Sequence, residues 1–123
     1  CLKDKVDILQ NIYGVDLFPN CKFIFLQSPG IKNDLNVKEY DVELSEFMKK
    51  IKGNINDFDV ALCYSPGFGN LICSEIYELG KSAVNMGSTL QMYFGVYNNS
   101  IMIENPVIFR LFMNKYWSRY KND

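Results

Sequence analysis

The residues best suited to chemistry lie in one short segment, 65–70, between the apolar run 58–64 and a helical pattern. Glycines in such a loop let backbone N–H groups approach an anion, and the helix dipole adds favourable potential there. Open α/β sheets bind ligands at this end of their strands. A tight turn that needs glycine only for its backbone fits equally well. The candidate binding residues are Ser65, Gly67, Phe68, Gly69 and Asn70.

A second polar segment, 85–91, leaves one predicted strand and enters a predicted helix, which places it at the same sheet edge. Its amides and hydroxyls are suited to hydrogen-bonding a sugar or a nucleotide. Ser88 or Thr89 also predicts a helix N-cap. The candidate binding residues here are Asn85, Gly87, Ser88 and Gln91.

Other nucleotide and metal motifs fit the chain poorly. Ile72 occupies the third glycine position of the dinucleotide fingerprint, and Asn85 stands where a ribose-binding acid is expected, so an NAD enzyme is disfavoured. No GKS or GKT follows the glycines, which excludes a Walker loop. Asp57 and Asp59 spell DxD, but they enter a strand, so we interpret them as solvated acids.

Composition excludes further classes of protein. The chain contains no His, which removes Ser-His-Asp and Cys-His catalysis and His-ligated zinc. The net charge of -1 argues against a nucleic-acid partner, and no apolar run is long enough to span a bilayer. We expect a cytoplasmic protein whose cysteines are free thiols, because no CxxC occurs. The cysteines are Cys1, Cys21, Cys63 and Cys73.

Hydrophobic periodicity predicts the elements that position these residues. Helices are predicted over 2–13, 40–51, 72–79, 88–94 and 105–117, buried strands over 22–27, 58–64 and 81–86, and a turn at 98–99. This alternation predicts an α/β fold, a Rossmann-like three-layer sandwich with a small, mainly parallel sheet. We expect residues 1–123 to form a single domain. Because Cys1 opens on a helical pattern, we interpret the chain as the C-terminal half or a fragment of a longer protein.

Aromatic residues gather toward the C-terminus, and we expect most of them to form core rather than a base-stacking platform. They are Tyr93, Phe94, Tyr97, Phe109, Phe112, Tyr116 and Trp117.

Several spaced motifs agree with one known family. They are FDVAL at 58–62, GFG at 67–69, GKSAV at 80–84, MGSTLQMYFGV at 86–96 and NKYW at 114–117. This string resembles a mostly uncharacterised family of polysaccharide-associated proteins, which is similar to GT-D-fold glycosyltransferases. The resemblance implies nucleotide-sugar binding and glycosyl transfer. It also implies a set of residues around the ligand: Gly67, Phe68, Gly69, Gly87, Leu90, Gln91, Phe94 and Gly95.

From these observations we predict the nucleotide-sugar-binding domain of a glycosyltransferase. A divalent cation, Mn²⁺ or Mg²⁺, would take its ligands from outside this chain, and no catalytic residue is assigned. The alternative is a non-catalytic, transferase-like interaction module that self-associates or docks onto the rest of its parent protein. Two differences from the family favour the alternative: Pro66 in the glycine loop, and Tyr97-Asn98-Asn99-Ser100 in place of a segment carrying Arg and Trp.

Overall fold

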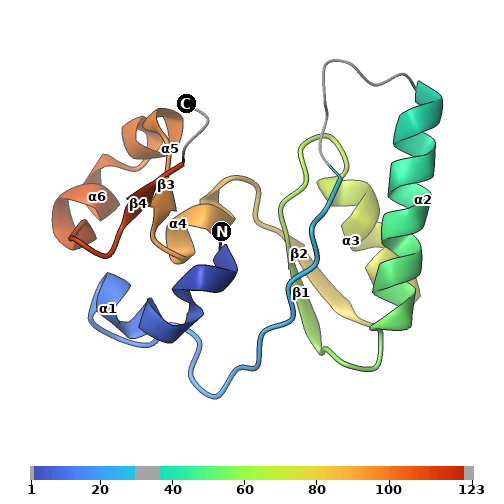
Figure 1. The fold of residues 1–123 in the computed structure, drawn as a ribbon, viewed down its shortest axis with the longest axis horizontal. Coiled ribbons are helices and arrows are strands. Elements are labelled where there is room, and N and C mark those ends of the chain that lie inside the picture. Colours follow the sequence, from blue (N-terminus) through green and yellow to red (C-terminus); the bar gives the residue numbers. More distant parts are fainter. Residues whose placement is uncertain (1, 30–36, 121–123) are drawn as a thin grey trace. The chain divides into compact units, whose positions relative to one another are not determined.

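The computed structural model describes residues 2–29 and 37–120. The chain divides into two compact units (Figure 1). The central unit is Ile24–Gly87, and the terminal unit combines Cys1–Phe23 with Ser88–Asp123.

The central unit is built on a parallel strand–helix–strand motif. Strands β1 (Val60–Cys63) and β2 (Ser82–Asn85) pair in parallel and are connected through helix α3 (Gly69–Glu78). Helix α2 (Val37–Gly53) precedes them (Figure 1). The predicted strands over 58–64 and 81–86 and the predicted helix over 72–79 are therefore present, with different ends. The strands are not buried as predicted, because the residues of β1 and β2 are exposed or half-buried and only Ala61, Cys63 and Ala83 of them pack against the core cluster.

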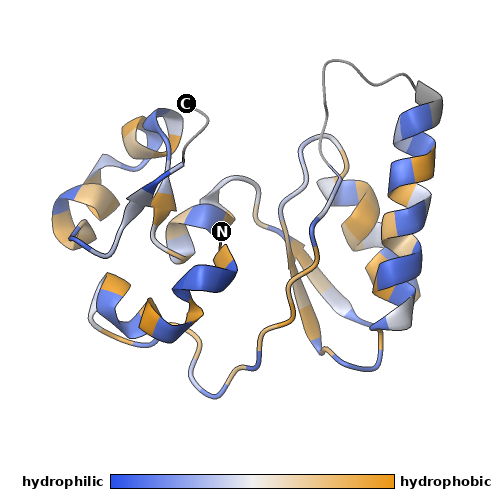
Figure 2. Cartoon of the chain, viewed as in Figure 1, coloured by the Kyte–Doolittle hydropathy of each residue, from blue (hydrophilic) through white to orange (hydrophobic). Residues whose placement is uncertain are grey.

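One face of this small sheet carries the core of the central unit. Phe47 and Ile51 of α2 pack with Ile72 and Ile76 of α3, and Ala61, Cys63 and Ala83 of the strands pack against this cluster. Because side chains alternate along a strand, Val60 and Val84 lie on the other face, where they are 55% and 47% exposed. Figure 2 shows hydrophobic residues in both strands and a mixture of hydrophobic and hydrophilic residues along α2.

The predicted buried strand over 22–27 is wrong. This segment is extended but joins no sheet, and Ile24 and Phe25 are exposed, while Leu26 alone packs against the core of the central unit. Two hydroxyls attach the end of the segment to the chain beyond β1. Ser28 Oγ donates to the Tyr64 carbonyl at 2.9 Å, and Ser65 Oγ donates to the Pro29 carbonyl. A strand needs a partner for its backbone ladder, and an apolar pattern alone does not supply one.

The terminal unit is mostly helical. Its elements are a 3₁₀ helix, η1 (Leu2–Ile8), helices α1 (Leu9–Tyr13), α4 (Thr89–Tyr93), α5 (Asn99–Glu104) and α6 (Pro106–Phe112), and the short parallel strands β3 (Val96–Tyr97) and β4 (Ser118–Arg119). The core includes Ile12, Phe94, Ile101, Phe109 and Trp117, so three of the seven C-terminal aromatic residues are buried in the core, rather than most of them as expected. Tyr93 and Phe112 are more exposed.

Local details of the terminal unit differ from the predictions. The helical pattern over 2–13 forms a 3₁₀ helix followed by α1, and the helix predicted to reach 117 ends at Phe112. The turn predicted at 98–99 is instead the start of α5. The Asn98 side chain caps that helix, because its Oδ1 accepts the Ile101 N–H at 2.8 Å. Asparagine favours both turns and N-caps, so its type alone does not distinguish them.

The described residues therefore form a mixed α/β protein with two small parallel sheets. Among the described helices, none is long and apolar enough to cross a membrane.

Candidate functional site

The glycine loop lies between the carboxyl end of β1 and the start of α3, as the sequence predicts. Gly67 has a φ of +81°, a conformation that strains residues with a side chain. The loop is closed by its own backbone, because the N–H groups of Phe68 and Gly69 both donate to the Ser65 carbonyl, at 3.1 and 2.9 Å. Two of the N–H groups nearest the helix start are thus already used within the turn.

Ser65 has a structural role in this loop. It is only 6% exposed, and its hydroxyl donates to the Pro29 carbonyl. The following residue, Pro66, has no backbone N–H to offer a ligand. The hydroxyl of this candidate residue therefore holds the 24–29 segment against the loop.

Three candidate residues meet at the edge where β1 and β2 end. Asn85, the last residue of β2, donates from Nδ2 to Oδ1 of Asn70 in the first turn of α3, at 2.8 Å. Its Oδ1 accepts the Gly87 N–H at 3.3 Å. Gly69 is pressed against the same amide, since a Cβ placed on Gly69 would lie 2.7 Å from Asn85 Oδ1. The structure thus brings together residues that are 15 positions apart in the sequence.

The candidates Ser88 and Gln91 belong to the terminal unit. Ser88 precedes α4, but its side chain makes no capping hydrogen bond, and its carbonyl accepts the Gln91 N–H at 3.1 Å. Leu90 and Phe94, which the resemblance associates with a ligand, are buried in the core of the terminal unit.

The segment 114–117 has a clear structural role in the terminal unit. Asn114 Nδ2 donates to the carbonyls of Asn11 and Ile12, at 3.0 and 3.2 Å, and Trp117 Nε1 donates to Ile12 at 3.3 Å. The last carbonyls of a helix lack partners within it. These two side chains therefore cap α1 from the far end of the chain. In the sequence, NKYW at 114–117 indicates only a resemblance, because the capped carbonyls lie about 100 residues away.

In the part of the chain that the structure describes, the acidic pair predicted from the sequence lies away from the carboxyl edge of β1 and β2. Asp57 and Asp59 are exposed and precede β1, as expected of solvated acids at a strand start. Within residues 2–29 and 37–120, no group of three or more His, Cys, Asp or Glu side chains is placed to hold a metal ion.

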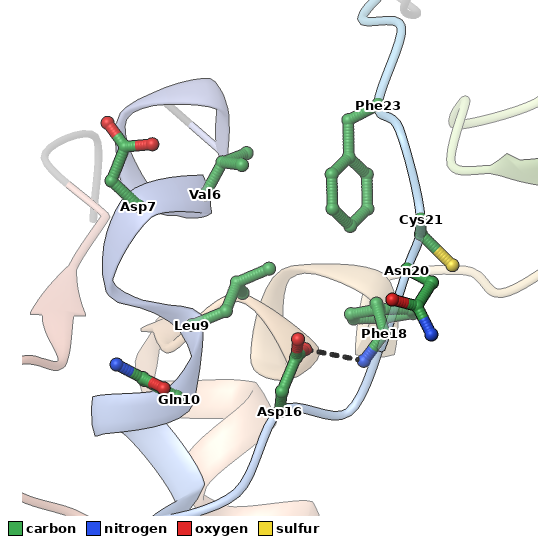
Figure 3. A pocket seen from close by; sticks show the side chains of 9 residues that line it. All are labelled: Val6, Asp7, Leu9, Gln10, Asp16, Phe18, Asn20, Cys21 and Phe23. Carbon is green, nitrogen blue, oxygen red and sulfur yellow. Dashed lines mark hydrogen bonds between the residues drawn. The ribbon is translucent and has the colours of Figure 1, made fainter.

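A shallow pocket of about 240 Å³ lies in the terminal unit, between the η1–α1 segment and residues 16–23 (Figure 3). Asp16 Oδ1 accepts the Phe18 N–H at 2.8 Å at its edge. The pocket contains none of the predicted site residues and is smaller than typical small-molecule sites, which measure roughly 300–1,000 Å³. Its lining residues are Val6, Asp7, Leu9, Gln10, Asp16, Phe18, Asn20, Cys21 and Phe23.

No family model, curated protein or solved structure matches this chain. The resemblance to the polysaccharide-associated family stays a prediction.

The edge formed by Gly69, Asn70 and Asn85 is suited to binding rather than to proton transfer. An asparagine amide has two N–H donors and an oxygen acceptor, and it does not titrate in the physiological range. Asn70 and Asn85 are both exposed, so their remaining donors and acceptors are accessible to a polar ligand.

Proposed function

We propose that the central unit binds the diphosphate of a nucleotide sugar at the carboxyl edge of β1 and β2. The observation that carries the proposal is the contact between Asn85 and Asn70, which puts polar groups from β2 and α3 side by side at this edge. In this proposal the unit is the nucleotide-sugar-binding part of a cytoplasmic glycosyltransferase, and its sheet belongs to a Rossmann-like three-layer sandwich.

Topology and electrostatics support this location. Parallel α/β sheets bind ligands beyond the carboxyl ends of their strands, and β1 and β2 end together here. The N-terminus of α3 faces the same edge and contributes positive potential toward a diphosphate. The amides of Asn70 and Asn85 would hydrogen-bond the sugar or the ribose.

The chemistry of transfer is not assigned to these residues. Among the described residues, Gly69, Asn70 and Asn85 meet at the carboxyl edge, whereas Mn²⁺ and Mg²⁺ prefer carboxylate ligands, so these three residues do not fit a divalent cation. Any cation and any general base would come from outside this chain. Binding of the nucleotide sugar is therefore the part of the proposal that can be tested directly.

The test is a thermal-unfolding series on the full chain with UDP-, GDP- and TDP-sugars at millimolar concentration. A ligand that binds only the folded state raises Tm. At a ligand concentration of 100 times Kd, the free energy of unfolding increases by about 2.7 kcal/mol. Inorganic pyrophosphate alone should raise Tm less, because it lacks the sugar and the nucleoside. Absence of a shift with every nucleotide sugar would contradict the proposal.

Variants locate the binding site. Gly67→Val and Asn85→Ala should abolish the ligand-induced shift. The matched control is Asn54→Ala, which removes an exposed amide of the central unit that bonds to the Lys50 carbonyl at 2.8 Å, outside the proposed site. The shift should survive in that variant. Equal shifts in Asn85→Ala and the control would place any binding elsewhere.

A second candidate function is favoured by the exposed face of the β1–β2 sheet, which carries Val60 and Val84. Parallel sheets are usually covered on both faces, yet Val60 and Val84 are exposed, and the loop amides of Phe68 and Gly69 are already bonded. In this alternative the chain is a non-catalytic interaction module, and in isolation a second copy covers the face. Sedimentation equilibrium should then show dimers in the native chain and fewer in Val84→Lys. A monomer at all concentrations would contradict this alternative.

A further inference from the structure

Two cysteines lie on neighbouring elements of the central unit. Cys63 is the last residue of β1, and Cys73 lies in the second turn of α3, the helix that packs on both strands. Both carry free thiols and are half-buried. Side chains alternate along a strand, so Cys63 lies on the face that α3 covers, where it packs against the core cluster.

Helix geometry brings the second thiol to the same place. Cys73 directly follows Ile72 and precedes Ile76 by three residues, and both isoleucines are buried against the sheet. Residues three apart share a side of a helix, so Cys73 flanks the buried stripe of α3. An interaction with the thiol of Cys73 contributes to the raised pKa of the Cys63 thiol, which agrees with the placement of both side chains between β1 and α3.

We propose that Cys63 and Cys73 form an intramolecular disulfide when the chain meets a low-molecular-weight disulfide such as oxidised glutathione. The two S–H bonds break and one Sγ–Sγ bond forms. The two electrons and two protons released reduce one oxidised glutathione to two molecules of glutathione. The bond would link β1 to α3 across residues 63–73, and it does not depend on whether a nucleotide sugar binds.

The surroundings of Cys63 predict the order of the steps. Burial raises the pKa of the Cys63 thiol to about 12, and the contact with Cys73 adds to the increase. The thiolate is the attacking form, so Cys63 is a slow nucleophile near neutral pH. Attack by Cys73 on oxidised glutathione would therefore come first, giving a mixed disulfide and one glutathione. Cys63 would then displace the second glutathione from Cys73.

Peptide mapping tests this proposal. A Cys1→Ser, Cys21→Ser chain, in which only the two thiols of interest remain, is treated with oxidised glutathione at pH 8, alkylated, digested and analysed by mass spectrometry. We expect the peptides that contain Cys63 and Cys73 to be joined, with near-complete loss of alkylation at both residues. Dithiothreitol should restore alkylation.

Single variants in that background test the order of the steps. Cys63→Ser should accumulate glutathione on Cys73, and Cys73→Ser should leave Cys63 largely reduced. Continued alkylation of both thiols, or glutathione on Cys73 beside a free Cys63, would overturn the proposal. The same mapping on the unsubstituted chain distinguishes this link from bonds to Cys1 or Cys21, so the result does not depend on how the variants fold.

Discussion

Asn85 lies so close to Gly69 that a side chain at this position of the helix start would force the Asn85 amide to move. A Cβ on Gly69 would be 2.7 Å from Asn85 Oδ1 and 2.8 Å from its Nδ2. The same amide donates to Asn70. The glycine at position 69 is therefore explained by the approach of a β2 side chain to α3, whether or not a ligand binds at this edge.

A double-mutant cycle tests this relationship. Gly69→Ala should lower the free energy of unfolding by about 1–2 kcal/mol, because the new methyl group displaces Asn85 from its bond to Asn70. In an Asn85→Ala background the same change should be neutral or slightly stabilising, since alanine is the better helix former. Urea unfolding of the four proteins gives a coupling energy, which we expect to be about 1 kcal/mol or more.

The cycle has a clear contrary outcome. If Gly69→Ala lowers the free energy of unfolding equally in both backgrounds, the side chain of Asn85 moves aside without any loss of stability. In that case the requirement for glycine at position 69 would come from the backbone conformation of the loop and not from the contact with the β2 residue Asn85.

A second prediction concerns the hydroxyl of Ser65. Ser65→Ala leaves the buried Pro29 carbonyl without the donor it has now, which should lower the free energy of unfolding by about 1–3 kcal/mol. The matched control is Ser28→Ala, whose half-buried hydroxyl bonds to the Tyr64 carbonyl at 2.9 Å, and its cost should be about 1 kcal/mol or less. Urea denaturation measures both. A Ser65→Ala cost no larger than that of the control would contradict the prediction.

A third prediction concerns stability at high pH. Burial, with a smaller contribution from Tyr93, raises the pKa of Tyr13 from 10.0 to about 12, and the neutral hydroxyl donates to the Met92 carbonyl at 2.7 Å. Because the folded state holds this proton more tightly, its contribution to stability is complete below pH 10 and is lost as the pH rises toward 12. Tyr13 is half-exposed, so solvent screening reduces the contribution to on the order of 1 kcal/mol.

Comparison with Tyr13→Phe isolates this contribution. The native chain should be more stable than the variant at pH 8, and the difference should shrink to nothing by about pH 12. Other groups that titrate in this range are common to both proteins and cancel in the comparison. A difference in unfolding free energy that stays constant with pH would contradict the prediction.

Local patterns were sufficient to predict the strand–helix–strand motif of the central unit. The apolar run before the glycines, the glycines and the helical spacing of Ile72 and Ile76 each act over a few residues, and the structure confirms β1, α3 and β2. The glycine segment was predicted as a loop leading into a helix at 72, whereas α3 already begins at Gly69 and includes Asn70. The meeting of Asn70 and Asn85 follows only from the parallel pairing of the two strands.

Contacts between segments that are distant in the chain could not be predicted from the sequence. The run 22–27 has the apolar character of a strand, yet it joins no ladder. The role of Asn114 and Trp117 depends on the carbonyls of Asn11 and Ile12, about 100 residues earlier. No local pattern specifies such partners.

The sequence by itself determined the composition, the absence of histidine and the elements whose hydrophobic period is complete within one segment. Only the tertiary structure decided that the Ser65 hydroxyl binds Pro29 and that Gly69 makes room for Asn85. The physical reason is that periodicity is a property of neighbouring residues. A hydrogen bond or a close approach, in contrast, depends on which distant atoms the folded chain brings within about 3 Å.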